Sequence, residues 1–206
     1  MVDPTAAELI ARLQRNPQDA AAFAALRNHY AAIGDYVSLA NLLEGYAARV
    51  GSPEQAAEVF FEAGELWLGQ LGNRPRAAQA YGRALERYGA HPAAGARLEQ
   101  LYRDANDTRA IVQLLEKRAE ALAKLDPSGA SNRQIAAIHH QLGEMWEHQF
   151  QRADRAISHY RKAFELDPSL VVAVYAAREI YRNAGNFKAA AVLYDLEANA
   201  EPDPKR

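Results

Sequence analysis

The feature that most constrains the fold is an internal repeat. The segment 63–86, AGELWLGQLGNRPRAAQAYGRALE, returns at 142–165 as LGEMWEHQFQRADRAISHYRKAFE. Equivalent residues lie 79 positions apart without a gap, from Gly64 to Gly143 and from Tyr81 to Tyr160. This pattern predicts two antiparallel helices that approach closely at the small residues, while rings fill the space beside them.

A second kind of hairpin alternates with the first. Tyr102 follows Tyr30 by 72 positions, and Tyr181 follows Tyr102 by 79. The offset grows because about seven residues, roughly two helical turns, are added near Asp126. We therefore expect longer helices or a projecting loop at that point.

Composition and local signals favour an all-α chain. Hydrophobic residues make up 49% and charged residues 24% of the sequence, and no segment alternates with a period of two. We predict an N-cap at Asp3 followed by Pro4, and capping boxes at 52–55 (Ser52 with Gln55) and 131–134 (Ser131 with Gln134). These signals mark the starts of three helices.

We predict a single repeat domain that spans the chain. Its parts are a lone helix at 1–16, hairpins at 17–51, 52–90, 91–126, 131–168 and 169–200, and a disordered tail at 201–206. The chain could also be one segment of a longer repeat protein.

Charge and composition exclude several functions. The formal net charge is -2, which argues against a nonspecific nucleic-acid binder. The sequence has no cysteine, which rules out a disulfide framework and a thiolate metal site. No apolar run approaches the length of a membrane span, and no basic leader precedes one. We predict a cytoplasmic protein without membrane insertion.

No nucleophile elbow, phosphate loop or zinc-protease motif is present, so we predict no enzymatic activity.

The pattern resembles the tetratricopeptide repeat (TPR) family over nearly the whole chain. Small residues early in the first helix, an aromatic residue three positions later, a glycine turn and a terminal proline are the stations that carry it. The small residues are Gly64 and Gly143, and the aromatic residues are Trp67, Trp146, Tyr30, Tyr102 and Tyr181. The turn glycines are Gly34 and Gly185, and the terminal prolines are Pro17 and Pro168. The repeat here is longer than the 34 residues typical of the family. The resemblance implies a right-handed α-solenoid of about five TPR-like hairpins, preceded by one N-terminal helix.

The resemblance also implies a concave groove, lined by the first helix of each hairpin, that holds a peptide or a partner helix. The groove residues would be Phe61, Glu62, Glu65, Leu68, Arg97, Gln100, Arg103, His140, Gln141, Glu144, His148, Tyr175, Glu179 and Arg182. Phe61 and Tyr175 would be apolar anchors beside an acidic and a basic patch. The family's clamp for terminal carboxylates is not predicted, because Ala24 stands where a lysine is needed beside Asn28.

Two features admit another interpretation. His140, Glu144 and His148 share one helix face and could suggest zinc, but the outer histidines would be about 12 Å apart, too far for one ion. We therefore predict no metal site and no cofactor. Trp67 and Trp146 could be ligand platforms, but packing at repeat interfaces explains them, so we predict that both are buried.

These inferences predict a non-enzymatic scaffold for protein–protein interaction. The alternative is a structural spacer or an oligomerisation segment without a groove ligand, in which terminal helices would join copies. A remote alternative is an RNA-binding helical repeat, which would need a basic stripe. The predicted partner is a protein or peptide, and not a nucleic acid or a membrane.

Overall fold

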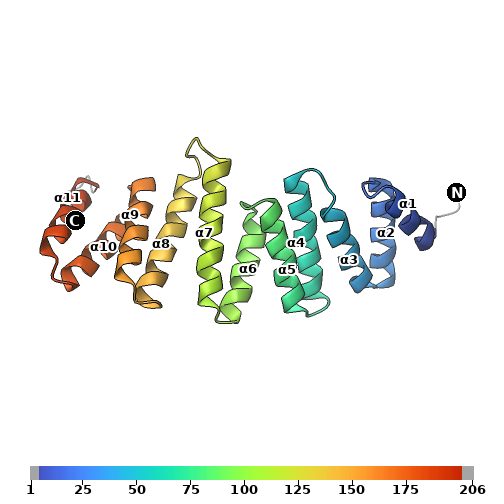
Figure 1. The fold of residues 1–206 in the computed structure, drawn as a ribbon, viewed down its shortest axis with the longest axis horizontal. Helices are drawn as coiled ribbons and strands as arrows, with labels where there is room; N and C mark the ends of the chain where they lie inside the picture. The colour runs from blue at the N-terminus through green and yellow to red at the C-terminus, as the bar shows by residue number, and fades with distance from the viewer. Residues whose placement is uncertain (1–4, 201–206) are drawn as a thin grey trace. The chain divides into compact units, whose positions relative to one another are not determined.

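The computed structural model describes residues 5–200, and its regular structure there is entirely α-helical (Figure 1). The predicted fold class, an all-α chain of helical hairpins of the solenoid type, is confirmed. The helices are α1 (Ala6–Arg15), α2 (Ala20–Ile33), α3 (Tyr36–Ala47), α4 (Pro53–Gly69), α5 (Arg74–Arg87), α6 (Pro92–Asp104), α7 (Thr108–Leu125), α8 (Asn132–His148), α9 (Ala153–Leu166), α10 (Val171–Asn183) and α11 (Phe187–Ala200).

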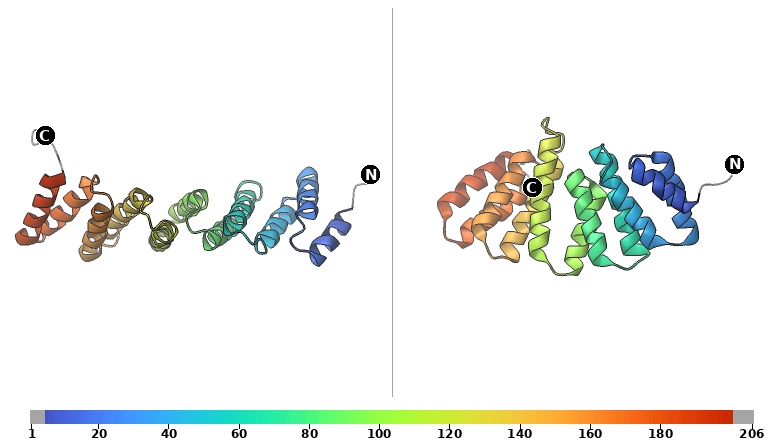
Figure 2. Two further views of the ribbon diagram at one scale, coloured as in Figure 1. Left: turned by 90° about the horizontal axis from the view of Figure 1, so that it is seen from above. Right: turned by 45° about the vertical axis from the view of Figure 1, so that its right-hand side comes forward.

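The chain divides into two compact units between Asn106 and Asp107. Unit 1 holds α1 to α6 and unit 2 holds α7 to α11. Within each unit every helix packs on the next one along the chain, and the views in Figure 2 show these neighbours. Packing between sequential neighbours is typical of helical repeats. The division of the sequence into five hairpins of one domain stays a prediction.

The turns of the second hairpin type share one backbone conformation. Gly34, Asn106 and Gly185, at equivalent repeat positions, have φ angles of 72°, 55° and 71°. The left-handed conformation costs glycine little, and asparagine tolerates it better than most residues. The residue after each turn then caps the second helix: the Asp35 and Asp107 carboxylates accept hydrogen bonds from the N–H groups of the first helical turn.

Contact between a glycine and a tyrosine ring sets the spacing of the first hairpin type. A Cβ atom added at Gly64 would lie 2.4 Å from Cε1 of Tyr81, and one added at Gly143 would lie 2.5 Å from the Tyr160 ring. Both tyrosines are fully buried. The ring of the second helix therefore lies directly on the backbone of the first, as the repeated small residue predicted.

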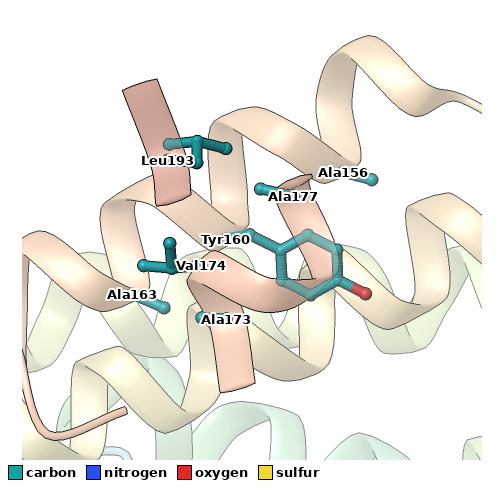
Figure 3. Close-up of a cluster of buried hydrophobic side chains, with 7 residues drawn as sticks. All are labelled: Ala156, Tyr160, Ala163, Ala173, Val174, Ala177 and Leu193. Atoms are coloured by element: carbon teal, nitrogen blue, oxygen red, sulfur yellow. The ribbon is translucent and has the colours of Figure 1, made fainter. Parts of the chain in front are cut away.

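The core of unit 2 continues this pattern into the last hairpin. Figure 3 shows Tyr160 of α9 beside Ala177 and Val174 of α10, with Leu193 of α11 closing the cluster. Alanines supply most of the remaining contacts. Small side chains therefore allow three successive helices to surround one ring.

The inserted residues lengthen a helix, as expected. The helix α7 has 18 residues, whereas its counterpart α3 has 12. The capping box predicted at Ser131 and Gln134 is wrong, because Ser131 makes no side-chain cap. Instead, the Ser131 N–H donates to the Asp126 carboxylate at 2.6 Å. This bond joins the residue that follows α7 to the residue that precedes α8.

The other two predicted helix starts have different outcomes. Ser52 accepts from the Gln55 N–H at 3.3 Å, which confirms the first half of that capping box. The Ser52 hydroxyl donates to Glu54. The predicted cap at Asp3 and Pro4 lies outside the described residues, as does the tail at 201–206. Within the described part, Thr5 and Glu8 form a complete capping box on α1.

Candidate functional site

In unit 1 the predicted groove residues lie on the first helices α4 and α6, and three of them form ion pairs between first helices. Arg27 of α2 donates to Glu62 of α4 at 2.6 Å. Arg97 of α6 donates to Glu65 of α4 at 3.0 Å. These pairs bring together three predicted residues, and they add Arg27, which the sequence analysis did not select. Glu62 and Glu65 of α4 are thus each paired with an arginine of a neighbouring first helix.

The apolar part of this surface is only partly accessible. Phe61 is half-buried, and its ring centroid lies 5.7 Å from that of Tyr81 and 5.2 Å from that of His91. Leu68 is also half-buried. The hydroxyl of Tyr81 donates to Glu65. Burial and this carboxylate raise the pKa of Tyr81, so its hydroxyl stays protonated as the donor.

The three predicted residues of α6 are exposed but engaged. Besides the Arg97 pair, Gln100 donates to Asp104 at 2.7 Å and Arg103 donates to Glu99 at 2.6 Å. Each arginine of α6 therefore has a carboxylate partner. The positive charge of both arginines is therefore balanced by neighbouring carboxylates.

In unit 2 the residues of α8 form a looser polar group. His140 lies 3.8 Å from the Glu144 carboxylate, and its ring contacts Tyr160. His148 approaches Glu147, at 3.9 Å, rather than Glu144. Gln141 is half-buried and has a partner of its own. No group of three acidic, histidine or cysteine side chains within residues 5–198 is placed to hold a metal ion.

A stacked cluster occupies α10 and extends to α11. Tyr175 is 50% exposed, as its predicted role requires, whereas Arg178 is only 8% exposed. The guanidinium carbon of Arg178 lies 4.5 Å from the Tyr175 ring centroid and 4.2 Å from that of Tyr194. The Arg178 side chain also pairs with Glu179 and Glu197.

This arrangement holds Tyr175 in place. Burial opposes the charge of Arg178, but the carboxylates of Glu179 and Glu197 outweigh it and raise the pKa of the arginine. Arg182 adds a second pair to Glu179 at 2.5 Å. Arg178 was missed by the sequence analysis. The only signal was an arginine within the otherwise apolar stripe of α10.

The two tryptophans differ. Trp67 is 5% exposed, donates its indole N–H to Glu44 at 2.6 Å, and packs under Arg76. Trp146 is half-buried, packs under Arg155 at 4.5 Å, and its indole N–H has no partner in the described part of the chain. The predicted burial is confirmed for Trp67 and is correct only in part for Trp146.

Two cavities were not predicted. A cavity of about 520 Å³ lies among α1, α2 and α3, lined by apolar residues such as Leu13, Leu26 and Leu42 together with Arg49. A second, of about 430 Å³, lies beside His139 and His159, whose Nδ1 atoms are 3.0 Å apart. Sequence spacing could not reveal either, because each depends on how far one helix lies from a neighbour.

Within the described residues, no helix combines the length and the apolar character that a membrane span requires.

No family model matches the chain, and no curated protein matches it. Similarity is found among solved structures. A crystal structure of MamA has 14% identity and a TM-score of 0.46, and covers 85% of this chain and 94% of that one.

Two further matches are YrrB, described as a TPR protein with an unusual peptide-binding site, and BtubC (BKLC) from P. vanneervenii. YrrB has 17% identity and a TM-score of 0.45, and covers 97% of this chain and 95% of that one. BtubC has 16% identity and a TM-score of 0.45, with coverages of 98% and 91%.

The chain resembles TPR proteins at the stations that its sequence predicted. Gly64 and Gly143 each lie under a tyrosine ring. Gly34 and Gly185 form left-handed turns. These stations determine how the hairpins of this chain pack and turn.

Proposed function

We propose that this protein is a non-enzymatic scaffold that binds a peptide or a partner helix on its first-helix surfaces. The observation that carries the proposal is the Tyr175 ring, half-exposed and stacked on the nearly buried Arg178. A ring held in one orientation loses little entropy on binding, and tyrosines of this kind are enriched among the residues that dominate binding energy.

The groups around Tyr175 favour a ligand segment with both apolar and polar character. Glu179 and Arg182 lie within two turns of α10, and half of the Arg182 side chain is exposed. On α8, the exposed Glu144 side chain and His140 offer an acceptor and a donor. A partner with an apolar side chain for Tyr175 and flanking charged groups fits this chemistry. We assign the predicted residues on α4 and α6 to a second binding surface, in unit 1.

A peptide-display selection against the immobilised protein tests the proposal. Enriched peptides are synthesised and their affinities measured by fluorescence anisotropy. The double variant Tyr175→Ala/Arg182→Ala is expected to weaken binding at least tenfold. Arg161→Ala, at an exposed arginine of α9, is the matched control and should bind like the wild type. Peptides that bind both variants as tightly as the wild type would refute the role of this surface.

A structural spacer or oligomerisation segment is the second candidate. The ion pairs of unit 1 support it, because Glu62, Glu65 and Arg97 already have partners within the chain. In this case the selection yields no peptide that depends on Tyr175. RNA binding is less favoured, since each arginine of α6 is paired with a carboxylate. A cytoplasmic location also remains a proposal.

A further inference from the structure

The last helix carries an uncovered apolar stripe. Phe187, Ala191, Tyr194 and Ala198 follow one another at intervals of four, three and four residues, and all are exposed. Phe187 is 69% and Tyr194 46% exposed. This spacing is the seam of a two-helix coiled coil. The opposite side of α11 is already occupied, because Leu193 packs in the core of unit 2.

The same repeat positions are covered in the two earlier copies. The stations of Ala191, Tyr194 and Ala198 correspond to Ala40, Leu43 and Ala47 in α3, all with 0% exposure. In α7 they correspond to Val112, Leu115 and Ala119, with at most 6% exposure. Both α3 and α7 pack against a following helix, α4 or α8. The stripe of α11 is therefore a surface that this architecture normally covers with one more helix.

The first helix of unit 1 behaves differently. On α1 most exposed positions are polar, including Glu8, Arg12, Gln14 and Arg15; Ile10 is 38% exposed, and Leu9 faces inward. A polar outer face is the property of a capping helix in a repeat array. Such a face is lacking on α11, so its apolar stripe is not explained as a cap.

We propose that α11 pairs with α11 of a second copy in an antiparallel, twofold-symmetric contact. A twofold axis between Val192 and Leu193 places Phe187 opposite Ala198 of the second copy and Ala191 opposite Tyr194 of the second copy. Every layer then joins one large and one small side chain. The protein already uses this arrangement where Tyr81 and Tyr160 pack on glycines. Self-complementarity is the requirement for a twofold interface.

Charge supports the same alignment. Lys188 and Asp195 are exposed on the flank of the stripe. They lie one heptad apart, so the antiparallel pairing places Lys188 beside Asp195 of the second copy, and the symmetry repeats the pair. In a parallel pairing Lys188 and Asp195 of the second copy would lie on opposite sides of the seam, so this ion pair could not form. Charges next to such a seam select partner orientation.

The size of the contact predicts a weak dimer. A helix of 14 residues is about 20 Å long. One pair of such helices buries less surface than the roughly 1,200 Å² of a standard interface. We therefore expect a concentration-dependent dimer with a Kd of about 1 to 100 μM, a range usual for small interfaces.

Sedimentation equilibrium of the whole chain, from about 1 to 300 μM to span that range, tests the proposal. The wild type is expected to pass from monomer to dimer. Ala191→Arg places a charge opposite Tyr194 and should shift the midpoint at least tenfold upward. It leaves the fold intact because this position is exposed. Ile33→Arg, at a residue 61% exposed on α2, is the matched control and should dimerise normally.

A charge exchange tests the orientation. Lys188→Asp alone, and Asp195→Lys alone, should each weaken the dimer by several-fold, and the double variant should restore it. A wild type that is monomeric throughout the range would overturn the proposal. Dimers that are insensitive to Ala191→Arg, or single charge variants that the double exchange does not rescue, would also overturn it. None of these readouts depends on Tyr175 or on a bound peptide.

Discussion

The hairpin α4–α5 of unit 1 and the hairpin α8–α9 of unit 2 have the same backbone plan but different polar chemistry. In both, a glycine lies under a tyrosine ring and a tryptophan lies under an arginine. Their turns are bonded alike, since the N–H groups of Asn73 and Arg152 donate to the tryptophan carbonyls at 2.7 and 2.8 Å. Contacts that fix the distance between helices are thus retained.

The polar groups around this plan have changed. Tyr81 donates to Glu65, whereas Tyr160 donates to Glu147 and not to Glu144, the repeat equivalent of Glu65. The left-handed turn position is Gly72 in one copy and Gln151 in the other. The comparison teaches that the acceptor of the tyrosine hydroxyl and the residue at the turn can vary, as long as the tyrosine ring stays in contact with the glycine backbone. We expect α8–α9 to be the less stable hairpin, because Gln151 takes a left-handed conformation that favours glycine.

The largest expected effect is on the two tryptophans. Trp67→Ala should lower the free energy of unfolding by about 3 to 5 kcal/mol, because it removes a buried ring and leaves Glu44 without its indole donor. Trp146→Ala should cost about 2 kcal/mol, since that ring is half-buried and its N–H is unpaired. Urea unfolding measures both. Equal losses would show that the hairpins are energetically alike.

The glycines come next. Gly64→Ala and Gly143→Ala should each cost about 1 to 3 kcal/mol, because the new methyl group would overlap a fully buried tyrosine ring. Gly82→Ala is the matched control, at a helical glycine with nothing within 4 Å of the added Cβ. It should stabilise the chain by up to about 1 kcal/mol. Thermal unfolding followed by circular dichroism measures all three. If the variants at 64 and 143 melted like the control, the close contact would be contradicted.

A histidine pair that has no counterpart at the equivalent positions of unit 1 gives unit 2 a pH dependence. Burial, then the charges of His139 and Arg155, lowers the pKa of His159 to about 4; burial and Lys162 also lower the pKa of His139. The repeat equivalents in unit 1 are Phe60 and Ala80.

Since the folded state disfavours the protonated histidines, their neutral forms contribute full stability above the unfolded pKa of 6.5. That contribution is lost as the pH falls from 6.5 toward 4, because the unfolded chain binds the protons first. We expect a loss of about 1 to 2 kcal/mol over this range. His139→Phe/His159→Ala, which copies unit 1, should show a shallower slope in urea unfolding at pH 4.5 and 7. An unchanged slope would exclude the pair as its source.

The smallest effect concerns the turn of α8–α9. Gln151 has a φ angle of 54°, where its counterpart Gly72 has 61°. Gln151→Gly should relieve this strain and raise the unfolding free energy by a few tenths to about 1 kcal/mol. The reverse change, Gly72→Gln, should lower it by a similar amount. A destabilised Gln151→Gly variant would mean that its side chain makes a contact worth more than the strain.

Much of the fold follows from local signals. Gly64 and Tyr81, and their equivalents 79 positions later, identified the hairpin and its close contact. The helix α7 begins at Thr108, after a turn, and ends at Leu125, before Asp126-Pro127, where the helical pattern of the sequence stops. In the capping box predicted at Ser131, the Gln134 side chain would accept from the Ser131 N–H, but Asp126, five residues earlier, accepts from that group instead. Competition between two acceptors depends on loop geometry, which spacing does not encode.

The candidate site was less predictable. The face on which Glu62, Arg97 and Tyr175 lie follows from helical periodicity. Which charges remain available does not, because Arg27 and Glu65 supply partners from neighbouring helices. Likewise, the sequence predicted Tyr175 as an apolar anchor equal to Phe61. Only the structure distinguished Tyr175, because Arg178 is buried between its ring and that of Tyr194.

The sequence by itself determined the helices, their turns and the glycine and tyrosine stations, because helix periodicity and left-handed turn geometry act over a few residues. The tertiary structure alone decided which carboxylate Tyr81, Tyr160 and Trp67 each use. Those outcomes depend on distances between helices, and a difference of about one ångström decides whether a hydrogen bond forms.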